Sequence, residues 1–333
     1  MKIFVTGATG FIGSTLVERL VADGLFVKAL IRRGSDRKFL KSVETKIEIV
    51  EGSLFDKDAL ENGVADCDVV FHLAGVVAAP SEGAFYKSNV LGTQNLIDAI
   101  NSKASRLKQF VLVSSLAAGG PGQTENPRLE TDKDEPVSAY GKSKLQAETV
   151  VRKRLRGIPI KIIRPPIVFG PRDSGVLTMI KPVLNGFMPL IRGRTLSGNK
   201  YYSVIFVNDL VDALIELLKV QKNSDFEIYY LSDGAVYTFR EILQSVANVK
   251  NSRPVVIMIP FFLVRIMALL SEVIGRLFKF PVPLNRDKLN EIYADYWVCS
   301  GTKFLKEYDF NPKNDLQLGM KKTIEWYEKE GWI

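Results

Sequence analysis

The chain opens with Lys2-Ile-Phe-Val-Thr-Gly-Ala-Thr-Gly-Phe-Ile-Gly13, which carries three glycines where a short apolar strand must turn into a helix. Gly7 permits the tight turn, Gly10 lets the backbone approach a pyrophosphate, and Gly13 lets the helix pack closely on the sheet. An amphipathic run over 14–23 follows, and the free N–H groups at the start of such a helix attract phosphate. The stretch therefore predicts a dinucleotide-binding strand–turn–helix unit.

Strand and helix signals alternate through the first half of the chain. Apolar strand-like runs lie near 2–6, 26–31, 47–50, 68–73, 109–114 and 160–164, and helical patterns lie near 12–23, 36–44, 56–63, 84–103 and 138–156. This alternation is typical of a doubly wound parallel sheet with helices on both faces. The strands are apolar throughout, as expected when both faces are covered. We therefore predict an α/β fold of the Rossmann type.

The rhythm changes after Arg164, where prolines become frequent. A strand and a capped helix are expected within 202–218, one more strand at 228–231, and a smaller, mostly helical domain from Thr238 onward. The predicted NAD(P)-binding Rossmann domain comprises 1–170 plus about 204–235, and the predicted substrate domain comprises about 171–203 plus 236–333.

Composition excludes several classes of function. The 333 residues carry a net charge of +8, but the local basic run 152–156 lies at a helix end without an aromatic stacking motif, so no nucleic-acid partner is expected. His72 is the only histidine, and no nucleophile elbow accompanies it, which argues against a Ser-His-Asp hydrolase. No residues have metal-ligand spacing. Cys67 and Cys299 suggest no disulfide framework and fit a reducing cytoplasm, and a chain that starts in a strand predicts no signal peptide.

The segment 255–280 is unusually apolar, although Arg265, Ser271-Glu272 and Arg276 interrupt it. Its uninterrupted apolar stretches are too short to span a bilayer. Three interpretations remain open: ordinary core of the smaller domain, a lid over an apolar substrate, or a peripheral membrane-surface helix.

Candidate catalytic residues lie in Tyr140-Gly-Lys-Ser-Lys144. Tyr140 and Lys144 are one helical turn apart on one face, and an ammonium held close to a phenol stabilises the phenolate. The motif follows Phe110-Val-Leu-Val-Ser-Ser115, whose hydroxyls end a buried strand. Ligands of parallel sheets bind at the carboxyl ends of the strands, so Ser115, Tyr140 and Lys144 are expected to converge beside the dinucleotide.

These motifs together resemble the extended short-chain dehydrogenase/reductases of the NAD-dependent epimerase/dehydratase superfamily. The matching segments, in chain order, are Thr6–Gly13, Asp68–Gly75, Asn89–Leu96, Ser114-Ser115, Tyr140–Lys144, Arg164–Pro171 and Phe206–Leu210. They cover roughly the first two-thirds of the chain, and they are specific for the superfamily but not for a substrate.

The resemblance implies a role for each matched residue. Tyr140 would be the general acid/base, Lys144 its partner, and Ser115, rather than Ser114, the group that holds the reacting oxygen. The cofactor would be bound by Gly7, Thr9, Gly10, Phe11, Ile12, Gly13, Arg32, Arg33, Ser53, Leu54, Leu73, Ala74, Gly75, Tyr140, Lys144, Pro166 and Ile167, with the last two bordering the nicotinamide. Asn89 is open between a place near the site and a structural hydrogen bond.

The end of the second predicted strand indicates the cofactor. NAD-binding relatives place an acidic residue there to hold the ribose 2′-hydroxyl, whereas this chain has Arg32 followed by Arg33. An arginine suits a 2′-phosphate and cannot accept a hydrogen bond from a hydroxyl. We therefore predict NADP rather than NAD. Ser53 stands where many relatives carry an aspartate near the adenine.

Leu116 and Ala117 stand where the dehydratases carry an acidic pair. The patterns Val113-Ser-Ser-Leu-Ala-Ala118 and Pro136-Val-Ser-Ala-Tyr140, with the closing segments Tyr296–Ser300 and Trp326–Trp332, resemble the dihydroflavonol 4-reductase and 3β-hydroxysteroid dehydrogenase branch. That branch implies an oxidoreductase that transfers a hydride between nicotinamide and a carbonyl or alcohol of a largely apolar small molecule. The alternatives are a nucleotide-sugar epimerase and a non-catalytic NADP sensor. The family also implies a homodimer, through the predicted helices 84–103 and 138–156.

Overall fold

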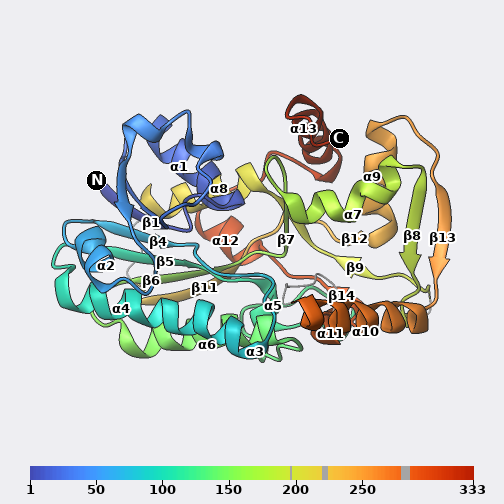
Figure 1. Ribbon diagram of the computed structural model, residues 1–333, viewed down its shortest axis with the longest axis horizontal. Helices are drawn as coiled ribbons and strands as arrows, with labels where there is room; N and C mark the ends of the chain where they lie inside the picture. Colours follow the sequence, from blue (N-terminus) through green and yellow to red (C-terminus); the bar gives the residue numbers. More distant parts are fainter. Residues whose placement is uncertain (196, 220–223, 279–285) are drawn as a thin grey trace. The chain divides into compact units, whose positions relative to one another are not determined.

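The computed structural model describes residues 1–195, 197–219, 224–278 and 286–333, and its chain forms two compact units (Figure 1). The first unit contains Met1–Ala118, Tyr140–Arg164 and Val211–Tyr229, and the second contains Gly119–Ala139, Pro165–Leu210 and Tyr230–Ile333. Each unit is therefore assembled from three separate stretches of the chain.

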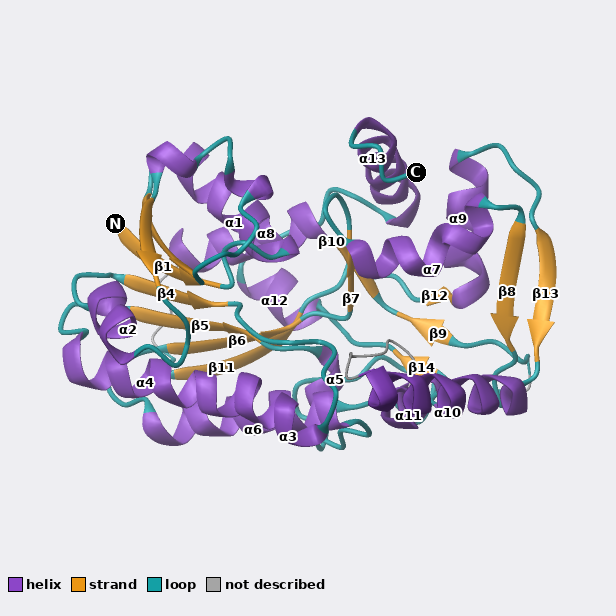
Figure 2. Ribbon diagram, in the orientation of Figure 1, coloured by secondary structure: helices purple, strands orange, loops and turns teal. Residues whose placement is uncertain are grey.

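The first unit is built on a seven-stranded sheet (Figure 2). Its strands, in spatial order, are β3 (Glu48–Glu51), β2 (Phe26–Ile31), β1 (Lys2–Thr6), β4 (Val69–His72), β5 (Gln109–Val113), β6 (Ile160–Arg164) and β11 (Phe226–Tyr230). Each pairing among β1 to β6 is parallel. The predicted Rossmann-type α/β fold is confirmed, and the order reverses beside β1, the strand before the glycine turn.

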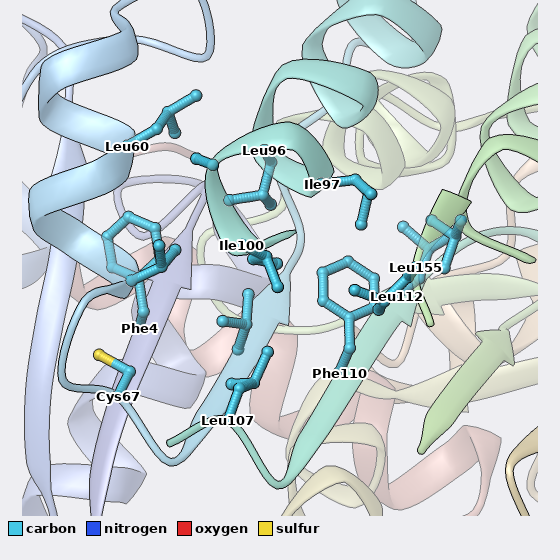
Figure 3. Packing of buried hydrophobic residues seen from close by; sticks show 14 of the residues in the cluster. Phe4, Leu60, Cys67, Leu96, Ile97, Ile100, Leu107, Phe110, Leu112 and Leu155 are labelled. Carbon is cyan, nitrogen blue, oxygen red and sulfur yellow. The ribbon is translucent and has the colours of Figure 1, made fainter. Parts of the chain in front are cut away.

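Helices cover both faces of this sheet, with α1 (Phe11–Ala22) and α8 (Val207–Lys219) on one face and α2 (Lys57–Val64), α4 (Gly92–Lys103) and α6 (Ala139–Arg154) on the other. Leu60 of α2, Leu96 and Ile100 of α4 pack over Phe4 and Phe110 of the sheet, all fully or nearly fully buried (Figure 3). Burial of aromatic and aliphatic side chains of this size is the main source of stability for the layer. It also holds the carboxyl ends of β1, β4 and β5 at one edge.

The predicted helix over 36–44 is wrong. The chain there forms two short 3₁₀ turns, Lys38–Leu40 and Glu44–Lys46. Leu40 and Val43 are buried, and their contacts with the rest of the unit hold the segment in these turns. The predicted helix 84–103 is also interrupted: α3 (Glu82–Phe85) leads into a π-helical turn, Tyr86–Leu91, before α4 begins.

The second unit combines helices with three small sheets. The sheets pair β10 (Val204–Phe206) with β7 (Ile167–Phe169), β9 (Tyr201–Tyr202) with β12 (Tyr237–Thr238) and β14 (Tyr296–Trp297), and β8 (Phe187–Ile191) with β13 (Val255–Ile259). The helices are α7 (Ser174–Leu184), α9 (Phe239–Val249), α10 (Phe261–Phe278), α11 (Arg286–Tyr293), α12 (Thr302–Glu307) and α13 (Leu316–Lys329). The short strands account for much of what the sequence left as irregular.

A second apolar core holds this unit together. It joins side chains of α7, α9 and α13 to β7 and β10, with Phe169 and Phe206 in an edge-to-face contact at 5.6 Å between ring centroids. Asp209 is buried beside this core and accepts hydrogen bonds from the backbone N–H groups of Lys313 and Asn314, at 3.0 Å each, and from the Asn314 side chain. These bonds fasten the chain just before α13.

The apolar segment 255–280 forms β13 and α10 over its described residues, 255–278. Val264 and Ala268 are buried, whereas most other large apolar side chains of the segment are more than 38 % exposed. Its interpretation as ordinary core is therefore wrong for most of these side chains. Within the described ranges, no helix combines the length and the apolarity needed to cross a membrane.

Candidate active site

The glycine turn after β1 is required by packing at two of its three positions. Gly7 has a φ of +74°, and a Cβ there would lie 2.7 Å from the backbone nitrogen of Ala74. A Cβ on Gly13 would lie 2.1 Å from the Gly7 carbonyl oxygen. Both distances are far below van der Waals contact, so β1, the strip after β4 and α1 approach one another only because these residues lack side chains.

Gly10 differs from the other two glycines. It is exposed, its φ of −77° and ψ of 175° suit any L residue, and the nearest atom to an added Cβ is the Gly7 oxygen at 3.3 Å. Helix α1 begins here with no capping side chain and no acidic residue in its first turn. Thr9 lies in the turn, and Phe11 and Ile12 supply the first helical amides. This open helix end fits the phosphates of a dinucleotide.

The strip Leu73-Ala74-Gly75 continues β4 beside that turn. The Leu73 N–H donates to the carbonyl of Thr6 at 3.2 Å, and the Ala74 N–H donates to the Thr6 hydroxyl at 3.3 Å. A Cβ on Gly75 would lie 3.7 Å from Lys144 Nζ. The predicted phosphate path and the predicted catalytic lysine therefore meet at Gly75.

The His72 side chain supports the end of β1 through hydrogen bonds to two hydroxyl groups. Its Nδ1 lies 2.6 Å from the Thr6 hydroxyl and its Nε2 lies 2.9 Å from the Thr93 hydroxyl, which itself donates to the Asn89 carbonyl. The imidazole thus donates through Nε2 and accepts at Nδ1. Complete burial, assisted by the nearby charge of Lys144, lowers the pKa of His72 to about 3. These hydrogen bonds and the neutral ring give His72 a structural role between β1, β4 and α4.

Tyr140, Lys144 and Ser115 are placed by α6 and β5. Lys144 is buried and donates from Nζ to the Val113 carbonyl at 2.9 Å, at the end of β5. Ser115 comes two residues later, and its hydroxyl accepts from the Ala117 N–H. Tyr140 is one helical turn before Lys144, and its ring lies 6.0 Å from that of Phe85. The structure therefore brings Lys144 to the strand end that carries Ser115, with Tyr140 on the adjoining turn of α6.

Burial lowers the pKa of Lys144 to about 8, against the opposing charge of Glu148, which favours the ammonium. The side chain therefore remains mostly charged at neutral pH. As an ammonium, Lys144 can stabilise a phenolate and can donate hydrogen bonds to ribose hydroxyls.

Glu148 is a site residue that the sequence reasoning missed. It is buried one turn beyond Lys144, accepts two hydrogen bonds from Arg164, at 3.0 and 2.6 Å, and accepts one from the Ser114 hydroxyl. Ser114 therefore has a structural partner beneath the strand end. The available signal was the i, i+4, i+8 spacing of Tyr140, Lys144 and Glu148 on one helix face.

Asn89 connects the π-helical turn to α6. Its side chain pairs with both backbone groups of Val76, at 2.8 and 3.1 Å, and donates to the Ser143 hydroxyl at 2.9 Å. Ser143 in turn donates to the Tyr140 carbonyl. Asn89 therefore makes structural hydrogen bonds. These bonds reach beyond its own helix to the turn of α6 that carries Tyr140.

The remaining predicted cofactor residues are less tightly packed. Arg32 and Arg33 follow β2 and are exposed. Ser53 and Leu54 follow β3, where Asn95 of α4 donates to the Leu54 carbonyl at 2.8 Å. Pro166 and Ile167 belong to the second unit, where Ile167 begins β7. Among the described residues, no group of three or more His, Cys, Asp or Glu could hold a metal ion.

Comparison with known proteins assigns this chain to a class. The family model for the NAD dependent epimerase/dehydratase family matches residues 3–231. The chain belongs to this family and is an NAD(P)-dependent enzyme of the extended short-chain dehydrogenase type, as its sequence predicted.

The relatives include reductases, epimerases and a dehydrogenase. The chain is 31% identical, over 83% of its length and 81% of the relative's, to 4-hydroxy-2-methyl-3-oxo-4-farnesyl-3,4-dihydroquinoline-1-oxide ketoreductase of Stigmatella aurantiaca. It is 28% identical to ceramide reductase of Caulobacter vibrioides, over 99% of this chain and 96% of that one. Epimerases and a decarboxylating sterol dehydrogenase are also among the relatives.

Solved structures share the fold. UDP-glucuronic acid 4-epimerase from Bacillus cereus, solved in complex with NAD, superposes with a TM-score of 0.77 at 20% identity, over 99% of this chain and 97% of that one. This likeness confirms the architecture.

Proposed function

We propose that this protein transfers a hydride between a nicotinamide dinucleotide and a carbonyl or alcohol carbon of a largely apolar small molecule. One observation carries the proposal: Lys144 Nζ lies at the end of β5 and beside Gly75, on the face of α6 that also carries Tyr140. Tyr140, one helical turn before Lys144, and Ser115, two residues after Val113, are carried by the same elements, which supports their assignment as the proton donor and the oxygen-holding hydroxyl.

In this mechanism the bound nicotinamide supplies or accepts the hydride. The Tyr140 hydroxyl protonates the carbonyl oxygen in reduction, or removes the alcohol proton in oxidation. Ser115 Oγ holds that oxygen, and the Lys144 ammonium stabilises the tyrosinate that forms. Asn89 and Ser143 position the first turn of α6 through their hydrogen bonds.

The first unit, by this proposal, binds the dinucleotide, and the second unit selects the substrate. Both named relatives above act on molecules with long apolar portions, a farnesyl quinoline and a ceramide, which supports an apolar substrate here. The free, buried Cys67 and Cys299 suit the reducing cytoplasm that we propose as the compartment. A homodimer through α4 and α6 is proposed by family analogy alone.

NADP is the proposed cofactor because Arg32 and Arg33 stand exposed after β2. A guanidinium on a 2′-phosphate makes charge-assisted hydrogen bonds, and losing one costs about 1.5–3 kcal/mol, or roughly ten- to a hundredfold in affinity. Arg32→Ala is therefore expected to weaken NADP binding by that factor and to leave NAD binding nearly unchanged. Equal losses for both cofactors, or tighter binding of NAD by the unaltered protein, would refute the preference.

The catalytic assignment is tested with Tyr140→Phe, which removes one oxygen and keeps the ring. We expect turnover to fall by about 100-fold or more, because acid/base catalysis is lost, while cofactor affinity changes little. Tyr86→Phe is the matched control, since Tyr86 is 44% exposed in the neighbouring π-helical turn and has no assigned role. A Tyr140→Phe enzyme with near-normal turnover would contradict the assignment.

An epimerase is the second candidate, because epimerases occur among the relatives. It would retain its cofactor through purification and show no net change of absorbance at 340 nm with substrate. A hydride-transferring reductase would consume NADPH at that wavelength. A non-catalytic NADP sensor would do neither, and Ser115, Tyr140 and Lys144 would then have no reason to converge.

A further inference from the structure

Helix α10 presents an apolar surface to solvent. Val264 and Ala268 are buried against the second unit. The outward apolar side chains are 39–64% exposed, and they are Phe262, Leu263, Ile266, Met267, Leu269, Leu270, Val273 and Ile274. We refer to these eight residues as the outer face. The apolar stripe of a helix is normally buried against another layer, so an exposed stripe of this size is typical of a helix with a further partner.

The outer face forms one continuous stripe along the helix. At about 100° per residue, its eight side chains fall within an arc of about 160°, opposite the buried pair Val264 and Ala268. No charged residue falls inside that arc. Arg265 is placed just beyond one edge of it and is itself exposed.

Strand β13 extends the apolar surface. Val255, Val256, Ile257 and Met258 are each 41–63% exposed. Because successive side chains of a strand point to opposite faces, both faces of β13, which pairs with β8, are apolar and largely uncovered. Phe187, the first residue of β8, is 50% exposed. Figure 2 shows that α10 begins close to where β13 ends, so the exposed strand lies next to the start of the helix. Isolated exposed apolar residues are ordinary, but a contiguous set of this size marks an interaction site.

The charges around this surface are predominantly basic. Between 253 and 275, where the side chains are described, the charged residues are Arg253, Arg265 and Glu272. Arg253 and Arg265 are exposed beside the apolar side chains. Arg192 and Arg240, also exposed, line a cavity of about 200 Å³ together with Met258 of β13. Guanidinium groups next to an exposed apolar surface match a partner that offers hydrocarbon bordered by anionic phosphates.

We propose that α10 and β13 dock on the surface of an anionic lipid bilayer, with the outer face inserted among the acyl chains and the flanking arginines at the headgroup phosphates. An interfacial helix of this kind lies in the plane of the membrane and buries its apolar face about 5–10 Å deep. The 18 residues of α10 would then extend about 27 Å along the surface. The docking does not depend on the proposed hydride transfer.

A second copy of the chain fits this surface less well. A two-fold symmetric interface brings the same patch of both subunits together. Arg265, exposed beside the outer face, would then enter the same interface from both copies, with Glu272 the one acidic side chain described between 253 and 275 to balance it. A phospholipid surface removes this repulsion.

The test is co-sedimentation of the purified protein with phospholipid vesicles. We expect the protein to bind vesicles that mix phosphatidylglycerol with phosphatidylcholine, to bind pure phosphatidylcholine more weakly, and to lose this difference at high salt. The variant Ile266→Ser/Leu270→Ser should reduce binding about tenfold or more, since it removes two inserted apolar side chains. Arg265→Glu should selectively reduce the preference for anionic vesicles.

Leu318→Ser is the matched control, because Leu318 is 42% exposed on α13 of the same unit and is separate from the outer face. It should bind vesicles like the unaltered protein, and all variants should keep the same unfolding midpoint in urea. The proposal is overturned if the unaltered protein stays in the supernatant, or if Ile266→Ser/Leu270→Ser binds as tightly as the control. It is also overturned if the double variant converts a dimer into monomers in sedimentation equilibrium without changing vesicle binding.

Discussion

Replacing Gly13 by alanine should lower the stability of the protein. Replacing Gly10 by alanine should instead weaken cofactor binding and leave stability nearly unchanged. At Gly13 the added Cβ would lie 2.1 Å from the oxygen and 2.8 Å from the carbon of the Gly7 carbonyl, and 3.1 Å from Ala8 Cα. These are backbone atoms, so no rotamer change can relieve the contact, and α1 must move away from the turn. Such overpacking costs about 1–3 kcal/mol, and here the upper end applies.

Alanine also favours a helix over glycine by about 0.5–1 kcal/mol, which offsets part of that cost at Gly13 within α1. The net expectation for Gly13→Ala is a loss of about 2 kcal/mol of unfolding free energy. Gly10→Ala should change stability by less than about 0.5 kcal/mol, because its backbone angles suit alanine, its closest contact is 3.3 Å, and alanine lowers the entropy of the unfolded chain.

Cofactor affinity should fall more for Gly10→Ala than for Gly13→Ala. A Cβ on Gly10 enters the space in front of the free amides of α1, where the pyrophosphate is expected, so Gly10→Ala should weaken NADP binding about tenfold or more. The assays are urea unfolding of the cofactor-free protein and titration of NADPH fluorescence. If Gly10→Ala binds cofactor normally, the phosphates do not pass over Gly10. If Gly13→Ala is as stable as the unaltered protein, the close approach of α1 to the turn is not a structural requirement.

Three further perturbations test the buried polar groups. Glu148→Gln leaves the Arg164 guanidinium, 1% exposed, without its counter-charge, and should lower the unfolding free energy in urea by about 3 kcal/mol; unchanged stability would show that the pair contributes nothing. Since burial lowers the pKa of His72 to about 3, the unfolded chain binds more protons than the folded chain between pH 6.5 and 3, so stability falls as pH falls. From pH 7 to 5 the unaltered protein should lose about 2 kcal/mol more than His72→Gln, and parallel pH profiles would contradict this. Asp209→Ala removes the acceptor of three hydrogen bonds and should lower the thermal midpoint with a loss of about 3 kcal/mol; an unshifted midpoint in calorimetry would exclude an anchoring role for Asp209.

The sheet and the glycine turn could be predicted from the sequence because their determinants are local. Apolar runs of strand length and glycines at fixed spacing carry the information within a few residues. The segment 36–44 could not be read in this way, because only tertiary contacts of Leu40 and Val43 decide its conformation. The mixed polar composition there is equally compatible with turns and with a helix.

The site was only partly predictable for a different reason. Tyr140, Lys144 and Ser115 belong to recognisable motifs, whereas Glu148 resembles any surface glutamate until Arg164, 16 residues away, is placed against it. The apolar segment 255–280 shows the same limit. Composition reveals that its side chains avoid water, but only the fold reveals which of them the chain itself leaves uncovered.

The interleaving of the two units has a consequence for how such a chain can be synthesised and can diverge. The chain passes between the units at five points, the last between Tyr229 and Tyr230, and the family match ends at residue 231. The edge strand β11 is thus among the last parts of the sheet to leave the ribosome, so a product truncated before it cannot complete the first unit. Downstream of this point, none of the described residues re-enters the sheet. Insertions and replacements in the last hundred residues can therefore accumulate without altering any strand of the dinucleotide-binding sheet, which leaves that third of the gene free to change what the enzyme accepts or where it docks.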